Sequence, residues 1–333
     1  MIEPPADNPA DPSAVPRSGD GAGPRTGDGA GPRSDDSPAP RLGARAGDRA
    51  DLRARPIGMF DSGIGGLTVL HECLVAMPAE DFVYFGDTAR FPYGSRSQDE
   101  LRLFAGQIAT FLDATPVKLL VVACYSATAA ALPALQEQFS TPIVGVVMPG
   151  ARAAVQTSRY RRIGVLATEA TVASGSYVRA VGTLDGGAEV IQQACPGLAS
   201  FIQDGDVASH EIVAAVRHFT TPLKERRPDV VIMGCTHYPL IAPMLQRHLG
   251  RDVTLVNPSA EIAREVAELL LRQGIENDAE REGAYRFFCT GEAAAFRSVG
   301  ARFLQMPLDD VEQIGLERLA ALVGRDHSPA RPR

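Results

Sequence analysis

The sequence predicts an α/β fold with mostly parallel sheets flanked by helices. Short apolar runs of the length of buried strands recur from Ile57 onward, and amphipathic stretches typical of helices lie between most of them. Strands that alternate with helices in this way form right-handed βαβ units. The chain has 333 residues, which is enough for roughly two domains of about 150 residues each.

The expected strands and helices follow one another in a regular order along the chain. The apolar runs cover residues 57–60, 82–85, 119–123, 143–147, 163–167, 230–233 and 253–256. The clearest helical patterns cover residues 98–113, 127–138 and 260–273. Ligands of open parallel sheets bind beyond the carboxyl ends of the strands. The residues that directly follow the apolar runs are therefore the candidates for function.

The first part of the chain, residues 1–54, has a different amino-acid composition. It is rich in Pro, Gly, Asp and Arg, and it contains the imperfect repeat SGDGAGPR and TGDGAGPR over residues 18–33. A segment with so few large apolar side chains buries too little surface to offset the entropy lost on ordering. We therefore expect a disordered tail here. The sequence shows no apolar stretch typical of a signal peptide or a membrane span.

Composition excludes several classes of function. The formal net charge of −7 gives no reason to expect a nucleic-acid partner, which usually requires a basic face. Five cysteines without close pairing indicate free thiols in a reducing cytoplasm rather than a disulfide framework. The only lysines, Lys118 and Lys224, lie at the entrance of an apolar run and in a charged run, so neither suits a pyridoxal-phosphate Schiff base.

Two cysteines occupy matching positions. Cys124 and Cys235 each follow an apolar run and precede an expected helix. The N-terminal end of a helix lowers the pKa of a nearby thiol and makes the thiolate more accessible. A single buried cysteine is more often an inert small apolar residue, but two in matching settings favour chemistry. Cys73 and Cys289 lack this setting and are expected to pack in the core, and Cys195, before a proline, is undecided.

The two thiols allow several kinds of site. A zinc site could use Cys124, Cys235 and His237, but the paired C-x-x-C spacing is missing, and a disulfide would be unusual in a cytoplasmic enzyme. The favoured alternative is acid–base chemistry on opposite faces of one carbon, in which a thiolate removes a proton while the opposite thiol delivers one. Asp61 could manage the proton of Cys124, and His237 that of Cys235. As a structural alternative, Asp61 could cap a helix.

The motifs around these residues resemble those of the glutamate racemases, in the cofactor-independent aspartate/glutamate racemase superfamily. The matching segments are GMFDSGIGGLTVL (58–70), YFGDTARFPYG (84–94), VVAC with SATAAA around Cys124, IGVLATEATVAS (163–174), ACPGLASFIQDG (194–205) and GCTHYPLI (234–241). The resemblance implies two pseudo-symmetric α/β domains with the active site in the cleft between them. It implies a first domain of residues 55–147 plus 255–325 and a second of residues 148–254.

The resemblance also assigns roles to residues. It implies that Cys124 and Cys235 are the acid/base pair and that Asp61 and His237 assist them. The positions implied to bind the substrate are Ser62, Pro92, Tyr93, Gly94, Tyr125, Ser126, Thr168, Thr171 and Thr236. It further implies no cofactor, conversion of L-glutamate to D-glutamate for the peptidoglycan of the bacterial cell wall, and a homodimer.

Two positions depart from the family pattern. Tyr125 stands where the family usually has Asn, so a bulky ring with one hydroxyl replaces an amide that offers both a donor and an acceptor. Gln203 stands where the family has a Glu that is thought to assist His237, and the neighbouring Asp204 would point elsewhere on a helix. Two alternatives to glutamate racemisation therefore stay open: a racemase of another amino acid such as aspartate, and a weakened or non-catalytic paralogue that acts as a binding protein.

Overall fold

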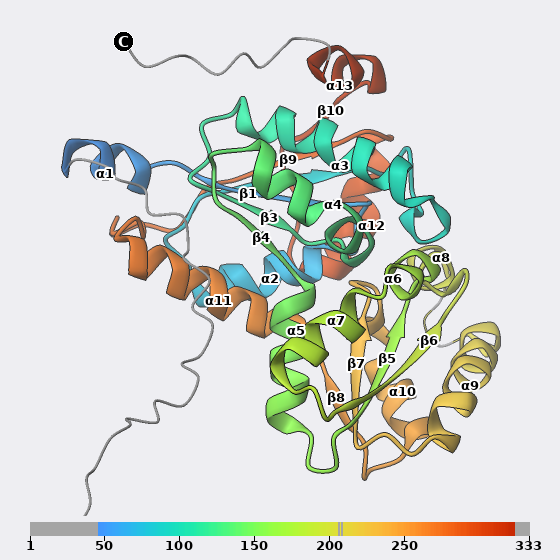
Figure 1. Cartoon of the computed structure of the whole chain (residues 1–333). Helices are drawn as coiled ribbons and strands as arrows, with labels where there is room; N and C mark the ends of the chain where they lie inside the picture. The colour runs from blue at the N-terminus through green and yellow to red at the C-terminus, as the bar shows by residue number, and fades with distance from the viewer. Residues whose placement is uncertain (1–45, 206, 208, 324–333) are drawn as a thin grey trace, which may run out of the picture. The chain divides into compact units, whose positions relative to one another are not determined.

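The fold contains two parallel sheets (Figure 1). The computed structural model describes residues 46–205, 207 and 209–323. The larger sheet has six strands in the order β10-β9-β2-β1-β3-β4, and the smaller has four in the order β6-β5-β7-β8. Within the described residues every strand pairing is parallel. The strands are β1 (Ile57–Asp61), β2 (Phe82–Gly86), β3 (Leu119–Val122), β4 (Ile143–Gly145), β5 (Arg162–Ala167), β6 (Glu189–Ala194), β7 (Val230–Gly234), β8 (Thr254–Val256), β9 (Tyr285–Cys289) and β10 (Val311–Gln313).

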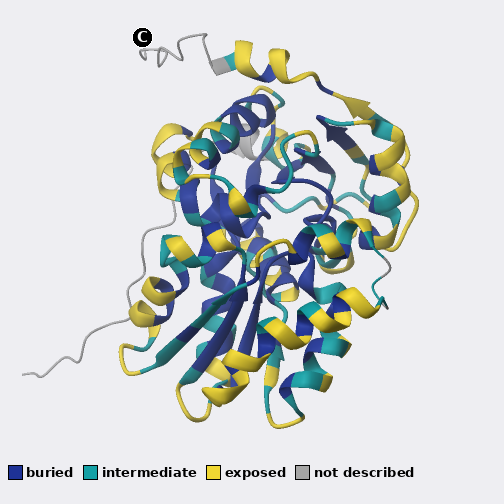
Figure 2. Ribbon diagram, turned by 90° about the vertical axis from the view of Figure 1, so that its right-hand side faces the viewer, coloured by how far each residue is buried: buried dark blue, intermediate teal, exposed yellow. Residues whose placement is uncertain are grey.

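Helices cover both faces of the six-stranded sheet. Alternate side chains of a strand point to opposite faces, so Met59, Tyr84 and Val121 join one buried cluster while Phe60 and Phe85 join another. The first cluster includes α2 (Leu67–Ala76), α11 (Pro258–Gln273) and α12 (Ala293–Leu304). The second includes α3 (Gln98–Asp113), α4 (Tyr125–Gln138) and α13 (Leu316–Val323). Figure 2 shows the buried strands between helices whose outer surfaces are exposed.

The four-stranded sheet is covered in the same way. Ile163, Val165 and Ile232 belong to the buried cluster that contains residues of α5 (Val147–Thr157) and α7 (Ser176–Leu184). Leu166 and Met233 face α8 (Leu198–Asp204), α9 (His210–Glu225) and α10 (Ala242–Leu249). The short helix α6 (Glu169–Ser174) follows β5. Two one-turn 3-10 helices, η1 (Tyr93–Ser95) and η2 (Tyr238–Ile241), follow β2 and β7. No helix in the described part of the chain is both long and apolar enough to cross a membrane.

The predicted fold class is confirmed, and each expected apolar run contains a strand. The run 143–147 ends as a strand at Gly145, because Val147 already begins α5. Helix α4 begins at Tyr125, two residues before the expected start of its helical pattern. The expectation missed β6, which has one buried residue, and β10, which has three residues. It also missed β9, whose buried run covers only Phe287–Cys289.

The predicted disordered tail is partly wrong. Residues 1–45 lie outside the described part of the chain, but Ala46–Arg53 form helix α1. The end of this helix is anchored by tertiary contacts, because Arg53 Nε donates to the carbonyl of Gly274 over 3.1 Å and Leu52 packs against the core. Its stability therefore comes from packing, which the composition of the segment does not reveal.

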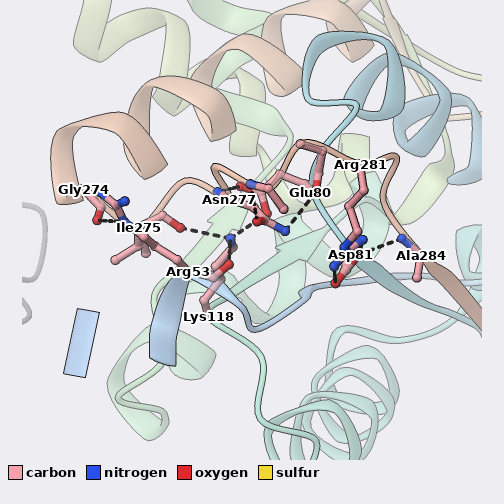
Figure 3. Close-up of polar contacts among 11 residues, drawn as sticks. Arg53, Glu80, Asp81, Lys118, Gly274, Ile275, Asn277, Arg281 and Ala284 are labelled. Atoms are coloured by element: carbon pink, nitrogen blue, oxygen red, sulfur yellow. Dashed lines mark hydrogen bonds and ion pairs between the residues drawn. The ribbon is translucent and has the colours of Figure 1, made fainter. Parts of the chain in front are cut away.

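The same region contains a buried ion pair (Figure 3). Lys118, just before β3, places its ammonium 2.5 Å from Glu80 Oε2 and also donates to the carbonyls of Arg53 and Ile275, each over 3.0 Å. The second carboxylate oxygen of Glu80 accepts from the backbone N–H of Asn277 over 2.7 Å. Lys118 thus connects the start of β3 with α1, with Glu80 ahead of β2 and with the segment after α11, at the amino end of the sheet.

Candidate active site

A cavity of about 220 Å³ lies at the carboxyl ends of strands from both sheets. Its walls come from the residues that follow β1, β2, β3, β5, β6 and β7. The lining residues are Ser62, Phe91, Pro92, Tyr93, Gly94, Ser95, Cys124, Tyr125, Ser126, Thr168, Glu169, Cys195, Gly197, Ala199, Ser200, Cys235, Thr236 and His237. The cavity thus lies beyond the carboxyl ends of the strands, where open parallel sheets bind their ligands.

The structure brings the predicted site residues together. All of them line the cavity except Asp61 and Thr171, which are fully buried directly behind it. Sequence reasoning missed Phe91, Ser95, Glu169, Cys195, Gly197, Ala199 and Ser200 as lining residues. The last four come from the segment that follows β6, so recognising that strand would have pointed to them.

Cys124 and Asp61 form the first catalytic candidate pair. Cys124 is the N-cap residue of α4, and its Sγ accepts from the backbone N–H of Ala127 over 3.5 Å. Burial nevertheless raises the pKa of Cys124 to about 12, and the nearby Asp61 carboxylate adds to the rise. The N–H of Ala127 at the helix start does lower this pKa, as expected, but the loss of hydration outweighs it and the net shift is upward.

Asp61 is a buried carboxyl rather than a helix cap. Its Oδ2 accepts from the backbone N–H of Gly63 over 3.1 Å, while α2 begins after Gly66 without a side-chain cap. Its Oδ1 has no hydrogen-bond partner among the described residues. Burial raises the pKa of Asp61 to about 6, against backbone N–H groups and the Cys124 thiol, which lower it. The carboxylate is thus ionised at neutral pH and has a free oxygen, as a proton acceptor requires.

Cys235 and His237 form the second candidate pair. Sγ of Cys235 lies 3.8 Å from Nδ1 of His237, and Nε2 of the same ring lies 3.1 Å from Oε1 of Gln203. Burial lowers the pKa of His237 to about 3 and raises that of Cys235. The expected helix directly after Cys235 is a single 3-10 turn, Tyr238–Ile241, and α10 begins only at Ala242.

A glycine-rich turn brings the two pairs close together. A Cβ on Gly65 would lie 2.3 Å from Oγ1 of Thr236 and 2.5 Å from the ring of His237, so only glycine permits this approach. The hydroxyl of Thr68 also donates to the carbonyl of Thr236 over 3.1 Å. The segment after β1 therefore supports the site residues that follow β7.

Three hydroxyl groups connect the start of α4 with the segment after β5. Ser126 Oγ lies 2.8 Å from Thr168 Oγ1 and 3.4 Å from Thr171 Oγ1, and the two threonine oxygens are 3.0 Å apart. Each hydroxyl can both donate and accept. Together they offer a polar, uncharged corner of the cavity.

Tyr125 contributes to the cavity wall at the first position of α4. Its side chain is buried, and its hydroxyl makes no hydrogen bond with any described residue. Glu169 is the one charged side chain among the described residues that line the cavity. A bound carboxylate would therefore meet hydroxyl and N–H donors rather than arginine or lysine.

All five cysteines are buried free thiols. In the part of the chain that the structure describes, no three His, Cys, Asp or Glu side chains gather as metal ligands would. Cys73 and Cys289 lie in the core, as expected, whereas the undecided Cys195 lines the cavity.

The chain is similar to known racemases. The family model for Asp/Glu/Hydantoin racemase matches residues 66–266. Glutamate racemases from Geobacter metallireducens and Lactiplantibacillus plantarum are 41% and 40% identical to the chain, over 79% and 78% of it and 97% and 96% of their own length.

Solved structures agree with the sequence relatives. Glutamate racemase isoform RacE1 from Bacillus anthracis is 38% identical, with a TM-score of 0.77 over 79% of this chain and 98% of that one. The Francisella tularensis glutamate racemase, solved with D-glutamate, is 34% identical, with a TM-score of 0.75 over 80% of this chain and 99% of that one. Cys124 and Cys235 at the carboxyl ends of strands from different sheets, the shared fold and this level of identity lead to one conclusion. The chain belongs to the Asp/Glu/hydantoin racemase family, among the glutamate racemases.

Proposed function

We propose that the chain interconverts L- and D-glutamate by a two-base mechanism without a cofactor. One observation carries the proposal: the thiols of Cys124 and Cys235, from strands of different sheets, line the same cavity, and each lies beside a titratable side chain. An acid and a base on two sides of one carbon are what inversion of that centre requires.

The proton steps balance within the site. Asp61 takes the proton of the Cys124 thiol, and the thiolate removes the proton from Cα of glutamate. The electron pair of the broken C–H bond remains on Cα, which then takes the thiol proton of Cys235 on its other face. The configuration inverts, Cys124 is again a thiol, Asp61 holds one proton and Cys235 is left as a thiolate beside His237. Loss of one proton from Asp61 and uptake of one proton at Cys235 restore the starting state. The reverse reaction begins with that thiolate.

Both thiols are protonated in the free protein at neutral pH, because burial raises the pKa of each. Thiolate formation therefore depends on Asp61 and His237 within the substrate complex. The remaining predicted residues are proposed to hold the amino and carboxyl groups of glutamate: Ser62, Pro92, Tyr93, Gly94, Tyr125, Ser126, Thr168, Thr171 and Thr236.

We also propose the biological role, the location, the oligomeric state and the domain bounds of the protein. D-glutamate would serve peptidoglycan synthesis in the cytoplasm, and the protein would work as a homodimer, as the family resemblance implies. We propose domains of residues 55–147 plus 255–325 and of residues 148–254. Sheet membership supports this division, because β1–β4, β9 and β10 form one sheet and β5–β7 lie in the other. It differs only at the second boundary, since β8 of the four-stranded sheet extends to Val256.

Proton exchange in heavy water tests the reaction directly. The protein should incorporate deuterium at Cα of both enantiomers of glutamate while circular dichroism shows racemisation. Cys124→Ser and Cys235→Ser should each abolish racemisation, since groups that act as a unit lose function together. Cys73→Ser, in the core rather than the cavity, is the matched control. Absence of exchange in the wild-type protein with either enantiomer would refute the proposal.

The position of Tyr125 favours a second candidate, the same reaction on a different amino acid. Its ring occupies the cavity wall where relatives of this family usually have a smaller amide, so the pocket could select another side chain. A panel of amino acids including aspartate, followed by circular dichroism, separates the two. A weakened binding paralogue instead requires that glutamate binds without turnover, and that Tyr125→Asn with Gln203→Glu raises activity by orders of magnitude.

A further inference from the structure

Asp87 is a buried carboxylate outside the proposed chemistry. It directly follows β2, is fully buried, and receives hydrogen bonds from three side chains. Its Oδ2 accepts from Arg90 Nε over 2.6 Å and from the hydroxyl of Tyr93, and its Oδ1 accepts from Thr290 Oγ1 over 2.8 Å. A carboxylate with this many donors is strongly fixed in position.

These contacts tie the start of a loop to the end of a neighbouring strand. Thr290 follows β9, and its hydroxyl oxygen also accepts from the backbone N–H of Ala89 over 2.9 Å. The backbone N–H of Gly291 donates to Thr88 Oγ1 over 2.9 Å. The loop that leaves β2 is therefore bound to the segment after β9 at the two residues that follow Asp87.

Arg90 carries the network onward to α3. Its guanidinium donates to Gln107 Oε1 over 2.5 Å and lies 4.1 Å from the ring centre of Phe104. The ring of Tyr93 also packs against Phe104, with 5.6 Å between centres. The charge of Asp87 is thus matched by a guanidinium that has its own hydrogen bond and aromatic contact, as a buried ion pair requires.

The residues between these anchors form one wall of the cavity. Phe91, Pro92, Tyr93, Gly94 and Ser95 all line it, and Arg90 and Tyr93 bracket the start of this segment. The Tyr93 hydroxyl donates its proton to the buried Asp87 carboxylate, so this proton is not available to a substrate. Tyr93 can then contribute only its ring and its backbone to the pocket.

We propose that Asp87 is a positioning residue that fixes the 91–95 loop as a wall of the substrate pocket. This role rests on the proposed function, since the loop would contact glutamate. The role requires a carboxylate: an Asn offers one acceptor oxygen, and its amide nitrogen would face a donor. Asp87→Asn should therefore displace the loop while leaving both thiols, Asp61 and His237 in place.

Steady-state kinetics with Asp87→Asn test the proposal. Loss of hydrogen bonds to a charged group should raise KM for glutamate by about tenfold or more, with kcat changed by less than about threefold. Asp99→Asn is the matched control, because Asp99 also pairs with an arginine three residues along the chain but is exposed. Its KM should equal that of the wild type. Thr290→Val removes a single donor and should raise KM by a smaller factor.

A second measurement does not depend on turnover. Alkylation of Cys124 and Cys235 by iodoacetamide, located by mass spectrometry, should be several-fold faster in Asp87→Asn than in Asp99→Asn. If wild-type protein fails to racemise glutamate, the proposed function falls, and the alkylation rates still decide the role of Asp87. A wild-type KM with wild-type alkylation rates, or a loss of kcat alone, would overturn the role. If Asp87→Asn does not fold, Thr290→Val decides by the same two measurements.

Discussion

The Nε2 atom of His237 lies 3.1 Å from the amide oxygen of Gln203, so the imidazole donates its proton to an uncharged group. Its other nitrogen, Nδ1, then faces Sγ of Cys235 as an acceptor. Burial lowers the pKa of His237 to about 3, and an amide offers no charge that would stabilise the imidazolium. His237 therefore acts as a neutral partner of the thiol. Asp204, which is exposed, does not replace the missing carboxylate.

Gln203→Glu should make His237 a better proton acceptor. A carboxylate at this distance raises the pKa of the ring, so kcat is expected to rise by about tenfold, which corresponds to about 1.4 kcal/mol. Initial rates from each enantiomer, followed by circular dichroism, measure the effect. Because the equilibrium constant of a racemisation is one, kcat/KM must rise equally in both directions.

Gln203→Leu is the matched comparison. It removes the acceptor of the Nε2 proton without adding charge, so the ring loses its fixed tautomer and kcat should fall. A Gln203→Glu protein that is slower than Gln203→Leu would contradict the assignment of His237 to the proton of Cys235.

Asp61→Asn should lower the activity and raise the free energy of unfolding. The pKa of Asp61 rises from 3.8 to about 6 on folding, so the ionised group destabilises the folded state at every pH above 6. This penalty is about 3 kcal/mol and vanishes below the unfolded pKa, where both states are protonated. Urea unfolding should show the variant more stable than the wild type at pH 8, with the gap closing toward pH 4. The exposed Asp99→Asn should show no such trend.

The pH dependence of kcat in the wild-type protein should follow the ionisation of Asp61. Protonated Asp61 cannot take the proton of Cys124, so kcat should decline as the pH falls below about 6. Asp61→Asn should be nearly inactive at all pH values. A wild-type pH profile that stays flat from pH 7 to pH 5 would remove Asp61 from the proton path.

Tyr125→Phe isolates the hydroxyl that lies beside the cavity without a partner among the described residues. We expect KM for glutamate to rise about threefold to tenfold with little change in kcat, since one neutral hydrogen bond contributes about 1 kcal/mol. Tyr125→Asn should keep activity, because the amide supplies a donor and an acceptor. If Tyr125→Phe binds glutamate as tightly as the wild type, the hydroxyl does not contact the substrate.

Lys118→Met should destabilise the fold and leave the chemistry intact. The substitution leaves the buried carboxylate of Glu80 without its ion-pair partner and two backbone carbonyls without a donor. The free energy of unfolding should fall by about 3–5 kcal/mol. Lys118→Met with Glu80→Gln should recover part of this loss. Thermal and urea unfolding measure the stability of both variants. Arg264→Met, which removes an ion pair with Glu261 at the surface, serves as the control. Because Lys118 and Cys124 lie at opposite ends of β3, kcat of the folded fraction should not change.

The sequence predicted the strands and site residues that depend on local pattern. A buried parallel strand is a continuous apolar run, so β1, β2, β3, β5 and β7 could be recognised, and their following residues line the cavity. Strand β6 reads EVIQQA and is mostly half-buried at the edge of its sheet, so it has no such run. Missing it also concealed Cys195 and Gly197.

Features that depend on packing could not be predicted. Position ahead of a helix is visible in the sequence, but the burial that raises the pKa of Cys124 appears only in the folded protein. The contact between Gln203 and His237 joins residues far apart in the chain, and only the family resemblance linked these two positions. Strand β10 has three residues, and it is a strand only because β9 supplies its hydrogen bonds.

The triangle of hydroxyls formed by Ser126, Thr168 and Thr171 has a consequence for how affinity responds to solvent. An arriving carboxylate would exchange hydrogen bonds with neutral groups that already satisfy one another, and no ion pair would form or break in that corner. Electrolyte screening acts on pairs of charges. Binding at this corner should therefore vary little with ionic strength, in contrast to sites that grip carboxylates with arginine.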